Sequence, residues 1–414
     1  MMITTRTVRP ASALAGLCWL CAALVACELV EVTNPGPIAD EDLNKPEAVP
    51  GIVTGMSSDL SDALDDLIFD TSIMADELAH GGSYTPEGLF YRGIIRPDEV
   101  NGLWAAMHTA RWTAENGIER MRRVLGEEGF EAHPLAPRAN FLAGIANRTL
   151  GENVCSAVID GGPEQPHTVH FERAEHYFSE AIRLATAQGN DDVRLAALAG
   201  RASVRAWLGR WDEAVADAQQ VPTNHVTVAF YSSNSGRERN YMYQETHVRF
   251  EITVYGTPWA EVFGDPRVPW DTMYDESGQG VRTGQDGRTP HFRQRKYPSF
   301  DADVPLVKGT EMRVLEAEAL LRQEDIPGAF GKINEMRAFY ELPPLTPPTT
   351  LEEAWATLHR ERGAVVWLEA RRLWDLRRWN AETGPAHHPF LTNRDKCIPI
   401  SLNEQLSNPN LQGT

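Results

Sequence analysis

The stretch AWLGRWDEAVADA, residues 206–218, joins two helical patterns through a short turn. Gly209 interrupts the apolar spacing of the preceding helix, and Asp212 is a suitable first residue for a new one. Trp211 follows the turn as a large aromatic residue, and Ala214 has a small side chain three positions later. Because a small residue lets two helix backbones approach closely, we expect a tightly packed pair of helices here.

A similar pattern recurs in residues 313–344, where Ile326 and Ala329 take the places of the aromatic residue and the alanine. Both stretches resemble the turn and second helix of a tetratricopeptide repeat, although Glu324 replaces the turn glycine in the later copy. The copies lie about a hundred residues apart, whereas a regular solenoid stacks its units consecutively. The sequence therefore predicts a mainly α fold, in which a tetratricopeptide-type helical scaffold carries long loop and short-strand insertions.

The apolar spacing places this scaffold at about residues 103–222 and 310–380. Aromatic residues at helical spacing, as in residues 103–125, are expected to lie in the core. Two insertions of different composition lie at about 76–101 and 223–305, and the second is rich in glycine, proline, aromatic residues and short β-type runs. Since binding residues often lie on loops held by a rigid frame, these insertions are the expected binding regions.

The N-terminus has the pattern of a cleaved signal peptide. Arg6 and Arg9 form a basic start, and an uncharged apolar stretch follows at residues 11–26. This stretch is shorter than the roughly 20 residues that a helix needs to span a bilayer. We therefore expect residues 1–26 to be removed as a signal peptide.

The cysteine at the end of this segment indicates how the mature chain is held. Cys27 follows Leu24-Val25-Ala26, which resembles the lipobox of bacterial lipoproteins, so we expect Cys27 to be lipidated. Residues 27–414 are then expected to form a single domain tethered by lipid, and several acyl chains on one cysteine hold a protein firmly. Cys155 and Cys397 remain, and an oxidising exterior would allow them to pair; the sequence leaves open whether they do.

The composition excludes some partners. The formal charge is −19, and removal of a signal peptide with two arginines and no acid changes it to −21. Nucleic acid is not an expected partner, because binding phosphates requires a basic patch. His167, His170 and His176 lack the spacing of a metal-binding helix and are interpreted as the solvated start of a helix. No cofactor or metal is therefore expected.

Several stretches, taken in order, resemble the SusD/RagB family of outer-membrane nutrient-binding lipoproteins. They are LVEVTNPG (29–36), MADELAHGG (74–82), DEVNGLWAAMHTARWTAENGIERM (98–121), RVLEAEALLRQEDIPGAFGKINEMRA (313–338), HRERGAVVWLEARRLWDLRRW (359–379) and CIPISLNEQLSNPNLQG (397–413). The chain departs from the family pattern at Ala370, where the family has glycine, and this is interpreted as a small steric change. Residues 225–305 match only weakly.

The resemblance implies a mainly α fold and a non-catalytic role at the outer membrane. In the family, a lipid-anchored protein captures a glycan or peptide and passes it to a SusC-like TonB-dependent transporter. Two alternatives remain open, an envelope-anchored tetratricopeptide-like scaffold and a glycoside hydrolase. A scaffold would need consecutive repeats, and a hydrolase needs two facing carboxylates about 5 to 9.5 Å apart.

Sugars stack an apolar face on an aromatic ring while polar side chains bind their hydroxyls, so the site should combine both types on loops. The alternative for Trp259 and Trp270 is that they anchor a long insertion to the scaffold, since large aromatic residues are mostly buried. The charged segment from Glu361 to Arg378 is interpreted as structural, because charges paired at helical spacing usually stabilise the helix itself. The expected ligand-binding residues are Tyr84, Tyr91, Trp259, Trp270, Asp271 and Tyr274.

Overall fold

The computed structural model describes residues 40–412. The signal peptide predicted for residues 1–26 and the lipidation predicted for Cys27 lie outside the described residues. The chain divides after Asn44 into two units, and the described part of the first contains a short 3-10 helix, η1 (Asp40–Leu43). Within residues 40–412, no helix has both the length and the apolar character required to cross a membrane.

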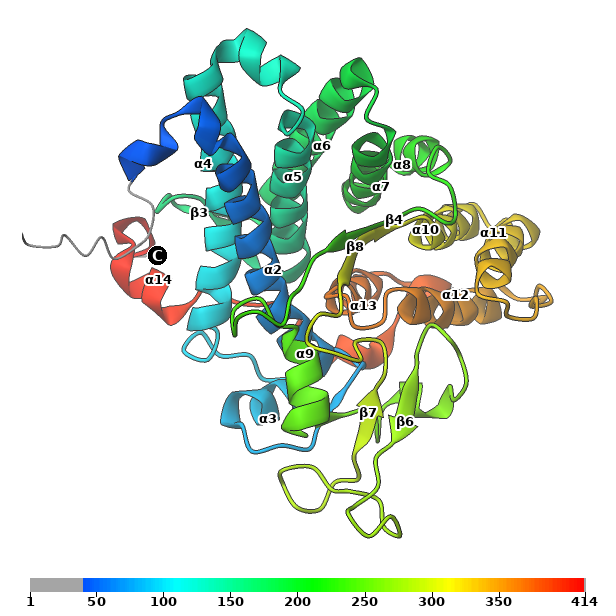
Figure 1. Cartoon of the computed structure of the whole chain (residues 1–414). Helices are drawn as coiled ribbons and strands as arrows, with labels where there is room; N and C mark the ends of the chain where they lie inside the picture. The colour runs from blue at the N-terminus through cyan, green and yellow to red at the C-terminus, as the bar shows by residue number, and fades with distance from the viewer. Residues whose placement is uncertain (1–39, 413–414) are drawn as a thin grey trace, which may run out of the picture. The chain divides into compact units, whose positions relative to one another are not determined.

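The second unit is built on a stack of helices (Figure 1). Helices of this stack that follow one another in the chain also pack against one another. α2 packs on α4, α4 on α5, α5 on α6, α6 on α7 and α7 on α8. The mainly α fold predicted from the sequence is confirmed. The stack contains α2 (Val49–Met74), α4 (Asn101–Ala132), α5 (Ala136–Asn153), α6 (Thr168–Gln188), α7 (Asp191–Trp207), α8 (Trp211–Ala218), α10 (Gly309–Arg322), α11 (Ile326–Phe339), α12 (Leu351–Val365) and α13 (Arg372–Ala381).

Short elements lie outside this stack. Three short helices are α3 (Thr85–Tyr91), α9 (Tyr241–Tyr243) and α14 (Leu402–Ser407). The strands are β1 (Ala79–His80), β2 (Ser156–Val158), β3 (Glu164–Pro166), β4 (Val226–Ala229), β5 (Ile252–Thr253), β6 (Trp270–Thr272), β7 (Phe292–Gln294) and β8 (Val304–Lys308). They form antiparallel pairs, β1 with β5, β2 with β3, β4 with β8 and β6 with β7.

Both turns of tetratricopeptide type adopt the same backbone conformation. Gly209, between α7 and α8, has a φ of 79°, and Glu324, between α10 and α11, has a φ of 61°. Ala214 and Ala329, which follow these turns, are fully buried at the helix contacts. The later copy therefore keeps the left-handed turn although a glutamate has replaced the glycine, and that replacement carries a conformational cost.

Close packing of α5, α6 and α7 depends on one aromatic ring. Phe178 of α6 is fully buried between Gly144 of α5 and Gly200 of α7. A Cβ atom added at Gly144 would lie 2.6 Å from a carbon of this ring, and one added at Gly200 would lie 2.5 Å away. Both positions therefore require glycine for the close approach of the helices.

The two ends of the insertion between α8 and α10 lie side by side at the helical stack. Although about 90 residues separate them, α8 and α10 pack against each other. Strands β4 and β8, at the two ends of the insertion, pair with Val226 opposite Lys308 and Ala229 opposite Val304. A bulge between Thr227 and Val228 shifts the register. The stack thus continues across the insertion.

Charged side chains join α10, α12 and α13 in the interior. Arg362 donates a hydrogen bond to Asp375 at 2.7 Å, and neither side chain is exposed. Arg378 donates to Glu318 at 2.7 Å, and Glu318 is also buried. Buried ion pairs of this kind hold a fixed geometry because breaking one leaves an uncompensated charge. These contacts agree with the structural interpretation of the segment from Glu361 to Arg378.

Two expectations about the helices are wrong. The aromatic and apolar spacing of residues 351–379 predicts a helix over the whole stretch, but the helix is broken at residues 366–371, where Leu368 and Ala370 have φ values of 55° and 56°. Ala370, where the SusD/RagB pattern has glycine, adopts a left-handed backbone conformation that favours glycine. The difference at this position therefore affects the backbone conformation as well as the steric fit. In α4, Trp104 is buried at 4% exposure, as expected, whereas Trp112 is 53% exposed.

A disulfide ties the C-terminal segment to the end of α5. Cys155 and Cys397 are bonded, with 5.1 Å between their Cα atoms. The backbone N–H of Cys155 donates to the carbonyl of Ile398 at 2.9 Å, and Ile398 donates to Asn153 at 2.8 Å. The chain beyond residue 397 is therefore held beside the helical stack by both covalent and backbone contacts.

Candidate ligand-binding groove

The loop between β1 and α3 carries Tyr84 and is held by the insertion. The backbone N–H of Ser83 donates to Glu251 at 2.6 Å, and the Ser83 hydroxyl donates to the other carboxylate oxygen at 3.1 Å. Glu251 is fully buried, and a Cβ atom at Gly82 would lie 2.0 Å from it, so this position requires glycine. The Arg249 guanidinium lies 5.0 Å from the centre of the Tyr84 ring. The Glu251 carboxylate and the Arg249 guanidinium therefore hold this loop in place.

A first hollow of about 630 Å³ opens beside this loop. Tyr84, Tyr91 and Tyr255 contribute aromatic surface to it, and the last two are each 42% exposed. Donors and acceptors surround the three rings, so the hollow can bind a ligand that has both an apolar face and polar groups. The polar side chains that line it are His80, Ser83, Thr85, Arg92, Asp286, Arg288 and Thr289.

A second hollow, of about 310 Å³, continues from the first, because Tyr91 and Gly256 line both. Asp76, Pro258 and Phe390 line the second hollow and also a third. The three hollows therefore adjoin in a row, which we call the groove. Segments from the beginning, the middle and the end of the chain meet along it.

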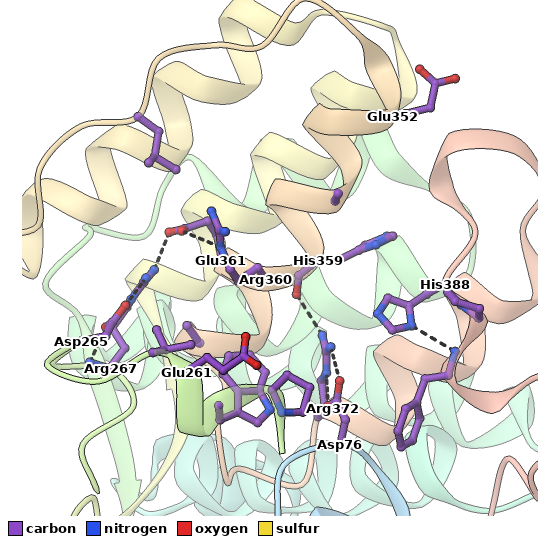
Figure 2. Close-up of a pocket in the computed structure, with 18 of the residues that line it drawn as sticks. Asp76, Glu261, Asp265, Arg267, Glu352, His359, Arg360, Glu361, Arg372 and His388 are labelled. Carbon is purple, nitrogen blue, oxygen red and sulfur yellow. Dashed lines mark hydrogen bonds and ion pairs between the residues drawn. The ribbon is translucent and has the colours of Figure 1, made fainter. Parts of the chain in front are cut away.

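The third hollow is the largest, at about 910 Å³ (Figure 2). One wall carries a buried cluster in which Arg267 donates to Asp265 and to Glu361, each at 2.6 Å. Arg337 donates to the other oxygen of Glu361 at 2.9 Å. Burial alone would raise the pKa of Asp265, but hydrogen bonds from Arg267 and its charge lower this pKa below its usual value. These charges compensate one another and keep the wall in place.

An ion pair lies where the second and third hollows adjoin, because Asp76 lines both and Arg372 lines the third. We call this pair the floor of the groove. Arg372 donates two hydrogen bonds to Asp76, both at 2.8 Å, and a third to the carbonyl of His359 at 2.9 Å. Asp76 and Arg372 are both buried. Burial favours a neutral Asp76, but the charge of Arg372 lowers the pKa of this carboxyl below its usual value. The pair is thus ionised at neutral pH.

Two histidines lie on the other side of this ion pair from the Arg267 cluster (Figure 2). Burial lowers the pKa of His359 to about 3 and that of His388 to about 4. Both rings are neutral at pH 7, and their centres lie 5.1 Å apart. The exposed charges of this hollow are therefore on other residues, among them Glu261, Glu352 and Arg360.

The part of the chain that the structure describes contains no group of three or more histidine, cysteine, aspartate or glutamate side chains placed to hold a metal ion. What the groove offers instead is a row of tyrosines and other aromatic side chains, compensated buried charges and a few exposed polar groups. Such a lining suits non-covalent binding of an extended polar ligand.

Residues 301–398 match the sequence model of the SusD family. This segment begins just before β8 and contains α10, α11, α12 and α13, which include the late tetratricopeptide-type turn and the buried charges. No match was found among curated proteins.

Solved structures of SusD superfamily proteins share the fold. One from Bacteroides thetaiotaomicron matches with a TM-score of 0.66 at 15% identity and covers 89% of this chain and 98% of its own. One from Bacteroides vulgatus matches with a TM-score of 0.63 at 14% identity, with 88% and 98% covered. A SusD-like carbohydrate binding protein from Bacteroides fragilis has a TM-score of 0.60 at 14% identity, with 83% and 92% covered.

Three of the six expected ligand-binding residues line the groove. Tyr84 and Tyr91 lie in the first hollow, and Trp259 lies in the third. Trp259 is only 2% exposed, and a Cβ atom at Gly363 would lie 2.6 Å from its ring. Its indole therefore forms part of the wall and has almost no surface on which a ligand could stack.

The other three residues lie on the hairpin of β6 and β7 and do not line the groove. Trp270 stacks on Phe292, with ring centres 4.9 Å apart and planes 7° apart. Asp271 accepts hydrogen bonds from Arg293 at 2.6 and 3.1 Å. Tyr274 is 58% exposed and is bridged to Val281, but it lines none of the three hollows.

Two aromatic residues of the groove were not predicted from the sequence. Tyr255 and Phe390 were not among the expected site residues, and the segment around Pro389 has the composition of a plain surface turn. Both aromatic residues lie beside glycine or proline in a loop. This is the same signal that indicated Tyr84, so it could have identified them as well.

Proposed function

We propose that this protein belongs to the SusD/RagB family and is a non-catalytic, lipid-anchored binding protein of the outer membrane. It captures an oligosaccharide in the groove and delivers it to a SusC-like TonB-dependent transporter. The predicted lipidation of Cys27 supports the anchor, and the resemblance to the SusD/RagB family supports the transporter as partner. Solved structures with the same fold include SusD-like carbohydrate binding proteins from Bacteroides fragilis and Bacteroides vulgatus.

The observation that carries this proposal is the row of three adjoining hollows. A single small ligand needs one hollow, whereas an oligomer can place successive units in neighbouring ones. Tyr84, Tyr91 and Tyr255 offer ring faces in the first hollow, and Phe390 lies between the second and the third. Aromatic faces beside polar groups favour a sugar chain.

The electrostatics of the groove support a non-catalytic role. A glycoside hydrolase needs a carboxylic acid with a raised pKa to protonate the leaving group. Asp76, Asp265 and Asp286 all line the groove, and each has a pKa below its usual value. For all three, hydrogen bonds or a nearby cation outweigh burial. They are ionised at neutral pH and do not fit the role of a general acid.

Binding should depend on the tyrosines that line the first hollow, among them the partly buried Tyr84 and the exposed Tyr91. We expect the double variant Tyr84→Ala/Tyr91→Ala to weaken oligosaccharide binding by about 1 to 3 kcal/mol, with little change in melting temperature. Tyr274→Ala is the matched control, because Tyr274 is an exposed tyrosine outside the groove. Calorimetry with a panel of glycans and peptides measures both variants against the wild type.

Each other outcome of this panel contradicts one part of the proposal. Hydrolysis of a bound glycan would favour the glycoside hydrolase, and binding only to proteins would favour the scaffold. Loss of binding in Tyr274→Ala with retention in the double variant would move the site to the hairpin.

Mass spectrometry of membrane-extracted protein tests the anchor, since an unlipidated chain starting elsewhere would refute it. Co-purification from detergent tests the transporter.

A further inference from the structure

A separate cavity of about 540 Å³ lies away from the groove, beside the first half of α2. The start of α5, strand β4 with the loop after it, and β8 complete its lining. It shares no lining residue with any of the three hollows of the groove. Its walls are mainly apolar, and the side chains concerned are Val53, Leu60, Leu135, Leu142, Phe230 and Leu306.

One cation lines this cavity without an acidic partner. The guanidinium of Arg138 donates a hydrogen bond to the hydroxyl of Ser57 at 3.3 Å. Within residues 40–412, no carboxylate lies within ion-pair distance of Arg138. Burial lowers the pKa of this guanidinium from its usual value, which is the mark of a partly desolvated charge.

A second arginine of the same cavity shows the contrast. Arg237, at the rim, lies 2.5 Å from Asp59 and 3.6 Å from Asp62. Its charge is therefore compensated within the protein, whereas that of Arg138 is not. A partly desolvated cation attracts an anion more strongly than an exposed one does, because less water screens the interaction.

The hydroxyls near Arg138 can complete an anion site. Because Ser57 accepts the hydrogen bond from Arg138, its own hydroxyl hydrogen remains available to a ligand. Ser58 also lines the cavity. Phe230, at 65% exposure, stands at the edge and offers apolar surface to a ligand that enters.

We propose that this cavity binds an amphipathic carboxylate, whose head pairs with Arg138 and Ser57 and whose apolar chain lies against the leucine and valine side chains. Charge complementarity selects the head group, and the apolar walls select the chain. The site is independent of the groove, so its failure would leave the proposed function unaffected.

Decanoate is a suitable probe, with decanol and decyltrimethylammonium as neutral and cationic ligands of equal chain length. In calorimetry with the full chain, we expect saturable binding of decanoate, at least about 10-fold tighter than that of either control. Arg138→Gln should weaken decanoate binding by at least about 10-fold, whereas Arg237→Gln should change it by less than about 3-fold. Arg138→Lys, which keeps the charge, should retain most of the affinity.

Equal binding of decanoate and decanol would show that only apolar contact matters and would overturn the proposal. Unchanged affinity in Arg138→Gln, or no saturable binding of decanoate at millimolar concentration, would overturn it too. Circular dichroism establishes that the variants are folded. If Arg138→Gln does not fold, the comparison of the three ligands on the wild type and on Arg138→Lys still decides the question.

Discussion

Glu324 has a backbone conformation that is unfavourable for a residue other than glycine. It is exposed and has a φ of 61°, whereas Gly209 meets the same requirement in the earlier turn with a φ of 79°. The left-handed conformation costs an ordinary residue about 1 to 2 kcal/mol, and glycine avoids this cost. The sequence pattern located this turn correctly but could not show that its geometry survives without glycine.

We expect Glu324→Gly to raise the free energy of unfolding by about 0.5 to 1 kcal/mol, since relief of the left-handed conformation exceeds the added entropy of the unfolded chain. The matched change Gly209→Ala should lower it by about 1 kcal/mol. Urea unfolding of both variants measures these values. A loss of stability in Glu324→Gly would mean that the glutamate side chain makes contacts that outweigh the strain.

Glu77 gives the stability of the protein a dependence on pH. It is 1% exposed, and one carboxylate oxygen accepts a hydrogen bond from the Leu368 N–H at 2.6 Å while the other has no partner. Burial raises the pKa of Glu77 to about 8 from a usual value of 4.5. Between these values the unfolded chain has released this proton and the folded chain keeps it. Stability should therefore fall as the pH rises from 4.5 to 8.

Glu77→Gln removes this proton and should flatten that part of the pH profile. Relative to the variant, the wild type should lose on the order of 2 kcal/mol between pH 5 and pH 7. Urea unfolding of both proteins at pH 5, 6 and 7 provides the test, and the difference between them isolates Glu77 from the other acids. Parallel profiles would show that the Glu77 pKa is not raised in the folded protein.

At the scale of elements, apolar spacing predicted most helices but not which side of each faces the solvent. Trp104 and Trp112 are eight residues apart, which at 3.6 residues per turn places them about 80° apart around α4. One is buried and the other is exposed for that reason. The break between α12 and α13 was missed because Val365 to Leu368 are all buried and apolar, so no glycine or proline marks it.

The binding elements were predicted less completely than the helices. Composition identified the loop regions, and Tyr84 and Tyr91, which were expected to bind the ligand, line the first hollow. It could not show that Trp270 would be covered by Phe292, or that Phe390 would approach from the far end of the chain. Those contacts depend on the packing of distant segments, which no local pattern encodes.

The disulfide between Cys155 and Cys397 should be an important restraint on the C-terminal elements. It joins residues 242 apart in sequence, so it removes much conformational freedom from the unfolded chain. We expect Cys155→Ala/Cys397→Ala to lower the free energy of unfolding by about 2 to 4 kcal/mol. A reductant should have the same effect on the wild type and none on the double variant. Equal stability of all these forms would show that the bond contributes nothing.

At the scale of the whole molecule, buried charges connect the early part of the chain with the late part. Asp76 and its partner Arg372 are 296 residues apart in sequence. Lys308, at the end of the insertion, donates a hydrogen bond to Glu369 with a donor–acceptor distance of 2.6 Å. The floor of the groove therefore forms only when these distant segments have come together.

Asp76→Asn should lower the free energy of unfolding by about 3 to 5 kcal/mol, because it leaves the buried Arg372 without a counter-charge. Arg183→Gln breaks exposed pairs with Glu131 and Glu180 and should cost less than about 1 kcal/mol. Thermal and urea unfolding compare the two. Similar small losses would mean that Arg372 finds another partner or reaches water when Asp76 is neutral.

The paired strands β4 and β8 have a consequence for how chains with this fold diverge. Because they bring the two ends of the insertion together beside the α8 and α10 contact, the path of the helices does not depend on the length of the segment between them. Changes of length within residues 230–303 can then leave the path of the helices unchanged, provided that Arg267 still pairs with Glu361. The match to the SusD family model begins at residue 301, near the C-terminal end of this segment. We expect related chains to differ most within it, and so to acquire new ligands without a new fold.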